Sequence, residues 1–232
     1  TYTVEVTDQG GYGPLTTSDL VVGEPDPVTA SVSSSSDVTC FGGSNGSLNV
    51  TASGGSGSYT YTLHSAGNSD IATNSTGEFT DLGANTYTVE VVDDNACGPV
   101  TTGDITIDEP AAISITNTSS TDVSCYDGAD GTIAVTAEGG TGSLSYTLQP
   151  DGITQGSGDF TGLDDGTYTV EVTDANDCGP VTSSDIVIGQ PAEIIITSSS
   201  ISDVTCNGGT DGSLSVTAEG GTGDLTYTLN SS

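Results

Sequence analysis

Two stretches of sequence alternate along this chain, and their regular return limits how it can fold. The first is 24 residues long and recurs without insertion as Cys40–Leu63, Cys125–Leu148 and Cys206–Leu229. The second opens with Thr-Tyr-Thr-Val-Glu-Val at Thr1, Thr86 and Thr167. Equivalent residues lie 85 and then 81 positions apart. Solenoid repeats usually span about 20–50 residues, so this period predicts a complete small domain used repeatedly.

The period divides the chain into four parts. Residues 1–25 are the C-terminal part of a module, residues 26–109 and 110–190 are complete modules, and residues 191–232 are the N-terminal part of another. The sequence opens and closes within strand patterns, which predicts a section of a longer periodic polypeptide. A second interpretation is that residues 1–25 of one copy complete the sheet that residues 191–232 leave open in a neighbouring copy.

Alternation of apolar and polar residues predicts strands in every part. Tyr2, Val4 and Val6 alternate with polar residues, which is the period of a half-buried strand. Glycine-rich turns separate the strands, and no segment has a helical period. These features predict an all-β chain of tandem immunoglobulin-like antiparallel β-sandwich modules, each of about 82 residues. Tyr168 starts a late strand, where such folds carry a tyrosine that bonds to backbone upstream.

The charge balance is one-sided. The 232 residues include 32 Asp and Glu, one His and neither Lys nor Arg, which gives a formal net charge of −32. Nucleic acid and anionic lipid surfaces are bound through basic side chains, so both are excluded as partners. No apolar run is long enough for membrane insertion. The carboxylates repel one another unless salt or cations screen them.

Five cysteines occupy two positions of the module and indicate an extracellular, oxidising setting. Cys40, Cys125 and Cys206 share one position, while Cys97 and Cys178 share the other, where the first partial module has Tyr12. Pairing within modules joins Cys40 to Cys97 and Cys125 to Cys178, and leaves Cys206 to a partner outside the chain. In an immunoglobulin-like sandwich these positions fall near opposite ends, whereas a disulfide needs Cα atoms within about 7 Å. A bond between neighbouring modules, such as Cys40 to Cys178, and free thiols are the alternatives.

Carboxylates recur near the module ends and are candidate ligands for calcium, which prefers hard oxygen ligands. The candidates are Asp93, Asp94, Asp174, Asp177, Asp108 and Glu109. The sequence has no EF-hand loop pattern, and a solvated acidic surface explains the same residues without a metal. No cofactor is required in either interpretation.

The sequence offers no set of catalytic residues, and we expect no enzymatic activity. His64 lies in the variable stretch of one module and has no counterpart in the others. Nucleophilic catalysis needs a base held beside the nucleophile, which the modules do not supply. Five Asn-x-Ser/Thr triplets are candidate glycosylation sites: Asn45, Asn49, Asn74, Asn117 and Asn230.

The two stretches together resemble a known family. The run C-x-G-G-x-[DN]-G-[ST]-[LI]-x-V-T-A-x-G-G-x-G and the companion G-T-Y-T-V-E-V-T-D-A-N-D-C at Gly166–Cys178 are similar to the SprB-type repeat of cell-surface adhesins in gliding Bacteroidetes. The resemblance implies a long, secreted, filamentous surface protein of adhesion or motility without catalytic residues. The chain departs from the pattern at Tyr12 and in its lack of basic residues.

These observations predict a structural and adhesive repeat array that forms a stiff, acidic, extracellular filament or cell-surface adhesin. The expected partners are copies of itself, as a homopolymer or a tandem continuation, and the cell surface or substratum. The alternative is a carbohydrate- or ligand-binding module array on a larger receptor or secreted enzyme. That alternative needs an aromatic or polar cluster in the variable stretch Leu63–Gly77, where His64 is the one distinctive side chain.

Overall fold

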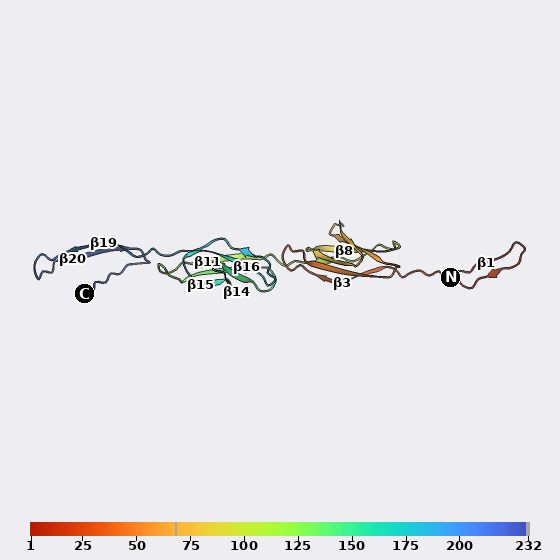
Figure 1. The fold of residues 1–232 in the computed structure, drawn as a ribbon, viewed down its shortest axis with the longest axis horizontal. Coiled ribbons are helices and arrows are strands. Elements are labelled where there is room, and N and C mark those ends of the chain that lie inside the picture. Colours follow the sequence, from red (N-terminus) through yellow and green to blue (C-terminus); the bar gives the residue numbers. More distant parts are fainter. Residues whose placement is uncertain (68, 231–232) are drawn as a thin grey trace. The chain divides into compact units, whose positions relative to one another are not determined.

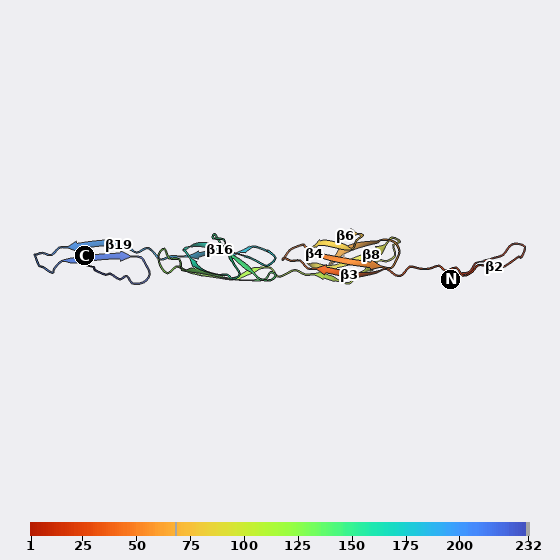
Figure 2. The same ribbon diagram turned by 60° about the horizontal axis from the view of Figure 1, so that its bottom comes forward.

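The computed structural model describes residues 1–67 and 69–230, and every regular element in them is a strand. The chain forms two compact units, Thr1–Val38 with Gly42–Glu109, and Thr39–Phe41 with Pro110–Ser232. Each unit contains one complete β-sandwich (Figures 1 and 2). The predicted all-β class is therefore confirmed. Among the residues described, no helix is long and apolar enough to cross a membrane.

The first sandwich has a three-stranded sheet in the order β3-β4-β7 and a five-stranded sheet in the order β10-β8-β5-β6, in which β9 also pairs with β8. All of these pairings are antiparallel. The strands are β3 (Thr29–Ser36), β4 (Gly46–Ser53), β5 (Tyr59–Ser65), β6 (Ser69–Asn74), β7 (Glu78–Leu82), β8 (Asn85–Asp93), β9 (Val100–Thr101) and β10 (Ile105–Ile107).

The second sandwich repeats this arrangement. One sheet has the order β11-β12-β15, and the other has the order β14-β13-β16-β17, with β18 also paired to β16. The strands are β11 (Ser114–Thr121), β12 (Gly131–Glu138), β13 (Ser145–Gln149), β14 (Ile153–Gln155), β15 (Asp159–Leu163), β16 (Gly166–Thr173), β17 (Val181–Thr182) and β18 (Ile186–Ile188).

The connections between the sheets are those of an immunoglobulin-like domain. The chain crosses from β12 to β13, returns from β14 to β15, and crosses again from β15 to β16. The first, second and fifth strands thus form one sheet, and the remaining strands form the other, as in immunoglobulin-like sandwiches. This topology confirms the predicted fold class.

Side-chain alternation along the central strands builds each core. Along β16, Tyr168, Val170 and Val172 are buried. Val170 and Val172 have 0% exposure and belong to one apolar cluster with Leu148 of β13 and Ile133 of β12. The first sandwich has Tyr87, Val89, Val91 and Leu63 at the equivalent places, and Leu48 in place of Ile133. Burying one such aliphatic side chain contributes about 1.5–3 kcal/mol to the stability of the fold. The inward-facing side chains of the alternating strands supply most of each core.

A tyrosine fixes the loop that enters the central strand of each sandwich. The hydroxyl of Tyr168 donates a hydrogen bond to the Asp164 carbonyl oxygen at 3.1 Å. The hydroxyl of Tyr87 donates to the Gly83 carbonyl oxygen at 2.9 Å. Burial raises the pKa of both phenols. The predicted tyrosine corner is present at Tyr168 and occurs in the first sandwich as well.

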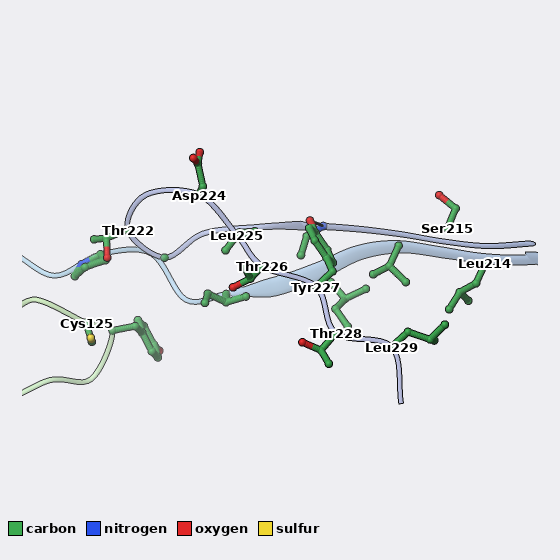
Figure 3. Close-up of a pocket in the computed structure, with 17 residues that line it drawn as sticks. Cys125, Leu214, Ser215, Thr222, Asp224, Leu225, Thr226, Tyr227, Thr228 and Leu229 are labelled. Carbon is green, nitrogen blue, oxygen red and sulfur yellow. Dashed lines mark hydrogen bonds between the residues drawn. The ribbon is translucent and has the colours of Figure 1, made fainter. Parts of the chain in front are cut away.

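Residues 1–25 and 191–230 each contribute a two-stranded sheet. β1 (Glu5–Val6) pairs with β2 (Leu15–Thr16), and β19 (Ile195–Ser202) pairs with β20 (Ser213–Glu219). Apolar side chains of both segments are exposed. Figure 3 shows Leu214, Tyr227 and Leu229 along an open groove beside the second hairpin. The alternating pattern therefore forms a hairpin in each segment, and its apolar face stays uncovered.

Candidate functional site

A buried aspartate anchors two loops at one end of the second sandwich. Asp174 directly follows β16 and is almost fully buried. One carboxylate oxygen accepts a hydrogen bond from the Thr141 N–H at 2.7 Å, in the turn between β12 and β13. The other accepts from the N–H groups of Asn176 and Cys178 at 2.9 and 3.0 Å. One charge thus joins the turn to the loop that carries Cys178.

Asp93 does the same in the first sandwich. Its carboxylate accepts hydrogen bonds from the N–H groups of Ser56, Asn95 and Cys97 at 2.9, 3.0 and 2.7 Å. The bond from Ser56 is the largest cause of a pKa below the ordinary 3.8 at Asp93. The bond from Thr141 has the same effect on the pKa of Asp174. Both groups are therefore carboxylates that the backbone stabilises in the charged form.

The other predicted calcium ligands make contacts of their own or are exposed. The Asp94 carboxylate accepts a hydrogen bond from the Ser58 N–H at 2.9 Å. The Glu109 carboxylate accepts one from the Gly42 N–H at 2.6 Å. Asp108 and Asp177 are exposed. Within residues 1–67 and 69–230, no three His, Cys, Asp or Glu side chains are grouped so that they could hold a metal ion.

A second aspartate position fixes the other end of each sandwich, where β4 and β12 begin. The Asp122 carboxylate accepts a hydrogen bond from the Gly189 N–H at 2.8 Å, and the Val123 N–H donates to the Gly189 carbonyl oxygen at 3.1 Å. Asp37 repeats the contact with the Asp108 N–H at 2.9 Å. Asp37 is not among the residues predicted for a site, although an Asp precedes each of the three equivalent cysteines by three positions. This recurrence in the sequence could have identified Asp37 as a structural position.

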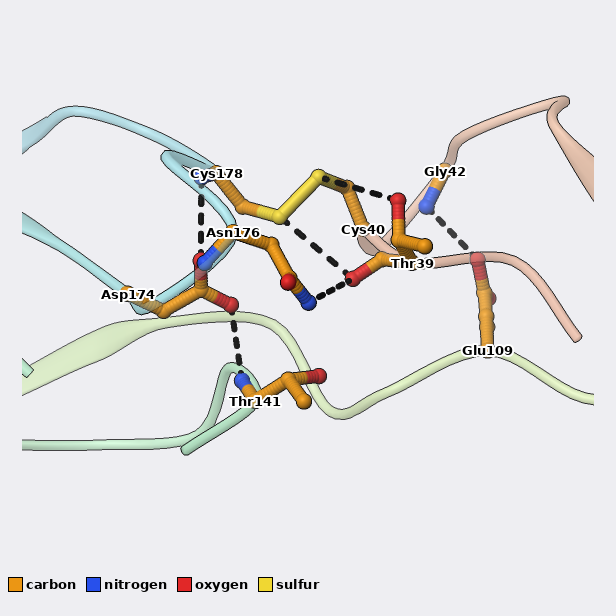
Figure 4. The surroundings of a disulfide bond; sticks show 8 residues. All are labelled: Thr39, Cys40, Gly42, Glu109, Thr141, Asp174, Asn176 and Cys178. Carbon is orange, nitrogen blue, oxygen red and sulfur yellow. Dashed lines mark hydrogen bonds between the residues drawn. A yellow bond between two sulfur atoms is a disulfide. The ribbon is translucent and has the colours of Figure 1, made fainter. Parts of the chain in front are cut away.

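Cys40 is bonded to Cys178, with Cα atoms 5.5 Å apart (Figure 4). Thr39–Phe41 belong to the first complete repeat in sequence but to the second compact unit in the structure. The Thr39 carbonyl oxygen accepts a hydrogen bond from the Asn176 side-chain amide at 3.3 Å. The same loop is anchored by Asp174 through its bond with the Cys178 N–H. The disulfide therefore ties residues of two consecutive sequence repeats.

The pairings predicted within modules are wrong. Because Cys40 is bonded to Cys178, neither Cys97 nor Cys125 has its predicted partner. Cys97, Cys125 and Cys206 are exposed thiols. The alternative bond between neighbouring modules, Cys40 to Cys178, is confirmed.

The strand register explains why a bond within one module fails. Gly46, at the start of β4, pairs with Leu82, just before β8 begins. Ser56, beyond the end of β4, bonds with Asp93 at the end of β8. The cysteine that precedes β4 and Cys97, which follows β8, thus lie at opposite ends of the sandwich. An eight-residue strand spans about 26 Å, far beyond the reach of a disulfide.

The aromatic and imidazole candidates are packed into the first sandwich. His64 is buried on β5, with its Nδ1 atom 2.8 Å from an Asp70 carboxylate oxygen. Tyr59 is half-buried, and its hydroxyl donates a hydrogen bond to the Gly54 carbonyl oxygen at 2.6 Å. Its ring meets that of Tyr61 edge to face, with centroids 6.3 Å apart. Tyr59 therefore packs inward.

The predicted glycosylation sites differ in accessibility. The Asn74 side chain accepts a hydrogen bond from the Gly77 N–H and donates one to the Glu78 carbonyl oxygen, each at 2.8 Å. Its amide is thus engaged in the loop before β7. The other four are Asn49, half-buried on β4, and the exposed Asn45, Asn117 and Asn230. Residues 231 and 232, which complete the last triplet, lie outside the described residues.

Solved structures resemble the chain with low sequence identity. The three N-terminal domains of the bacteriophage RB49 highly immunogenic outer capsid protein (Hoc) are 16% identical, with a TM-score of 0.45, over 86% of this chain and 70% of that chain. The C-terminal 282-residue fragment of intimin, solved with the intimin-binding domain of the translocated intimin receptor, is 14% identical, with a TM-score of 0.35, over 75% of this chain and 67% of that chain. The search of curated proteins found no match.

A family model describes the recurring stretch directly. The model of the SprB repeat matches residues 32–68, 117–152 and 198–232. Each match begins within the equivalent strand, β3, β11 or β19, and spans the glycine-rich stretch after the first cysteine position. The chain therefore carries three SprB repeats.

Proposed function

We propose that this chain is a section of a stiff, acidic filament or adhesin outside the cell, which acts by extending and attaching. The three SprB repeats support an adhesin-like repeat protein of the cell surface. The net charge of −32 supports a surface that stays hydrated and resists collapse onto itself. The proposed partners are further copies or modules of the same kind and the surface to which the filament attaches.

The observation that carries the proposal is the combination of separate cores with a covalent link. Each sandwich has its own apolar cluster, so each repeat is a folding unit that can be added in series. The bond from Cys40 to Cys178 joins residues of consecutive repeats. Pro110 begins the second repeat, and its fixed φ restricts the connection. These features favour a stiff series over a flexible string of domains.

Negative-stain electron microscopy of the native protein tests the filament. We expect long, uniform fibres whose width is that of a single sandwich. Short rods attached to a different globular domain would contradict the proposal and favour the ligand-binding alternative.

Adhesion is tested separately with coated beads under flow. Beads coated with the 232-residue chain should be retained on glass or polysaccharide better than beads coated with poly-glutamate, which matches the sign of the charge but lacks the fold. Equal retention of the two coats would argue against an adhesive role.

A further inference from the structure

Each complete sandwich has a three-stranded sheet with an edge strand at either side. In the first sandwich these edges are β3 and β7, and in the second they are β11 and β15. An edge strand presents backbone N–H and C=O groups that have no partner, so proteins usually protect it from pairing with another chain. Charged side chains and very short strands are two of the usual means. A difference in protection between the two edges therefore indicates which of them is open to a partner.

A carboxylate protects one edge of each three-stranded sheet and is missing from the other. Ser119 on β11 and Asp159 on β15 pair with the same residue of β12, so they lie in one row across the sheet. The equivalent row of the first sandwich begins at Ser34 on β3 and ends at Glu78 on β7. Over eight residues each, β3 and β11 contain no Asp or Glu. Both repeats thus have the same protected edge and the same unprotected edge.

The other edge strands in the described part of the two sandwiches are charged or short. β6 contains Asp70. β9 and β17 have two residues each, and β10, β14 and β18 have three residues each. In a chain with a net charge of −32, β3 and β11 are therefore the long edges at which a second acidic chain meets no carboxylate on the strand.

The outer edge of β11 is accessible. Among the described residues β11 pairs with β12 alone, which leaves its opposite edge without backbone partners. A groove of about 560 Å³ separates residues 115–118 from residues 181–184, and none of the residues that line it is charged. At the other end of the strand, the Ser120 hydroxyl donates a hydrogen bond to the Val187 carbonyl oxygen at 3.4 Å. Every residue of β11 except Ile115 is exposed.

Hydroxyl groups along these strands indicate what kind of strand can be added. The hydroxyls of Ser36 on β3 and Ser47 on β4 are hydrogen-bonded at 2.7 Å. Those of Thr121 on β11 and Thr132 on β12 are hydrogen-bonded at the same distance. Cross-strand pairs of Ser and Thr stabilise a sheet, so an uncharged strand rich in Ser and Thr suits the open edge. β3 and β11 have this composition themselves, since residues 33–36 are four serines.

We propose that β3 and β11 pair with the same strands of a second copy, so that two filaments associate side by side. This inference rests on the proposed function and deepens it, because it names the contact between copies. Contact through β7 or β15 would instead bring Glu78 or Asp159 against another acidic chain that has no Lys or Arg. The pairing is noncovalent and is opposed by the charge of both copies, so filaments diluted in low salt stay single.

The association is tested by light scattering on the 232-residue chain at several salt and protein concentrations. In about 0.01 M salt, where the screening length is about 30 Å, we expect the mass of a single chain. In about 0.15 M salt the screening length falls to about 8 Å, and the mass should increase with protein concentration. A single-chain mass at every protein concentration in the higher salt would contradict the proposal.

Two double variants compare the two edges of the sheets. Ser34→Asp with Ser119→Asp gives β3 and β11 the protection that β7 and β15 have, and should abolish the increase in mass. Thr80→Asp with Thr161→Asp adds the same charge at exposed positions of β7 and β15, and should leave the increase intact. Both variants share their terminal segments and thiols with wild type, so a difference between them comes from the edges. Equal effects of the two variants would overturn the proposal.

A third double variant separates charge from a change of side-chain shape. Ser34→Asn with Ser119→Asn alters the same two positions without adding charge, and should still associate. Loss of association in this variant would show that the missing carboxylates are not what leaves the edge open, and the argument from edge protection would be wrong.

Hydrogen exchange measured by mass spectrometry locates the contact. Backbone N–H groups that become hydrogen-bonded exchange more slowly. Peptides that contain β3 and β11 should therefore gain protection as the mass increases, whereas those that contain β7 and β15 should not. An increase in mass without protection of β3 or β11 would place the contact elsewhere and refute the pairing.

The same measurements distinguish this inference from its alternatives. A chain that stays monomeric, and in which β11 is protected only when a polysaccharide is added, would assign the edge to a sugar and overturn the proposal. Monomeric chains that still adhere on coated beads would remove the side-by-side pairing and leave the proposed function standing.

Discussion

At the scale of single residues, the carboxylates act in two opposite ways. Most are exposed and repel one another across a chain that has neither Lys nor Arg. Asp93 and Asp174 instead hold loops together through backbone N–H groups. Repulsion weakens as exposed carboxylates are protonated in mild acid. The loop anchors persist to lower pH, because their pKa values lie below the ordinary 3.8.

These opposite effects predict a maximum of stability in mild acid. A carboxyl group with a lowered pKa in the folded state stabilises the fold above its unfolded pKa, and this contribution is lost as pH falls through the folded value. We expect the melting temperature to rise from pH 7 toward about pH 4 and to fall below it. The Asp174→Asn variant should have a lower melting temperature than wild type at pH 7. Its melting temperature should fall less than that of wild type in acid. Circular dichroism melts measure both.

The exposed Asp177 provides the control for that variant. Asp177→Asn removes the same charge three positions away and should follow the wild-type curve at low pH. If the melting temperatures of Asp174→Asn and wild type fell equally in acid, the Asp174 anchor would not be the cause of the lower stability at low pH.

At the scale of elements, turns position the strands through glycines with left-handed backbone. Gly139, between β12 and β13, has φ +90°, and a Cβ atom there would lie 2.0 Å from the Ala112 carbonyl oxygen. Gly152, between β13 and β14, has φ +71° and open space around the Cβ position. The two positions thus separate the cost of backbone strain from the cost of a steric clash.

Substitution by alanine should distinguish the two costs. Gly152→Ala should destabilise the second sandwich by about 1–2 kcal/mol through its left-handed backbone alone. Gly139→Ala should cost more, because the methyl group also displaces the Ala112 carbonyl. Urea unfolding of the two variants gives the comparison. Equal losses would mean that the segment at Ala112 moves aside without cost.

Sequence pattern was sufficient for the elements and insufficient for the contacts between distant residues. The alternation around Val170 and Val89 predicted the buried strands because burial on one face has a period of two. Local alternation does not predict the disulfide, because the partner of Cys40 lies 138 residues away in the next repeat. Asp93 was predicted as an acidic group at a module end, but its role depends on the Ser56 N–H, which strand register brings to it. The local sequence pattern does not determine the strand register that brings these two residues together.

At the scale of the whole molecule, charge governs the response to salt. Each of the 32 carboxylates lacks a Lys or Arg partner within the chain, and the screening length falls from about 30 Å at 0.01 M to about 8 Å at 0.15 M salt. We expect the melting temperature to rise over this range. Magnesium and calcium at equal concentration should raise it equally if they act by screening. A higher melting temperature in calcium alone, reversed by a chelator, would instead indicate specific calcium sites.

The disulfide also determines which parts of the molecule bear tension. A pull applied at the two termini passes through the sulfur bridge, and the loop from residue 41 to residue 177 is shielded from it. Force spectroscopy should therefore record a further extension of roughly 450–500 Å once a reductant opens the bridge across this separation of 138 residues. The same extension without reductant would refute the shielding. A surface fibre built from such links would keep most of each sandwich folded while it is being stretched.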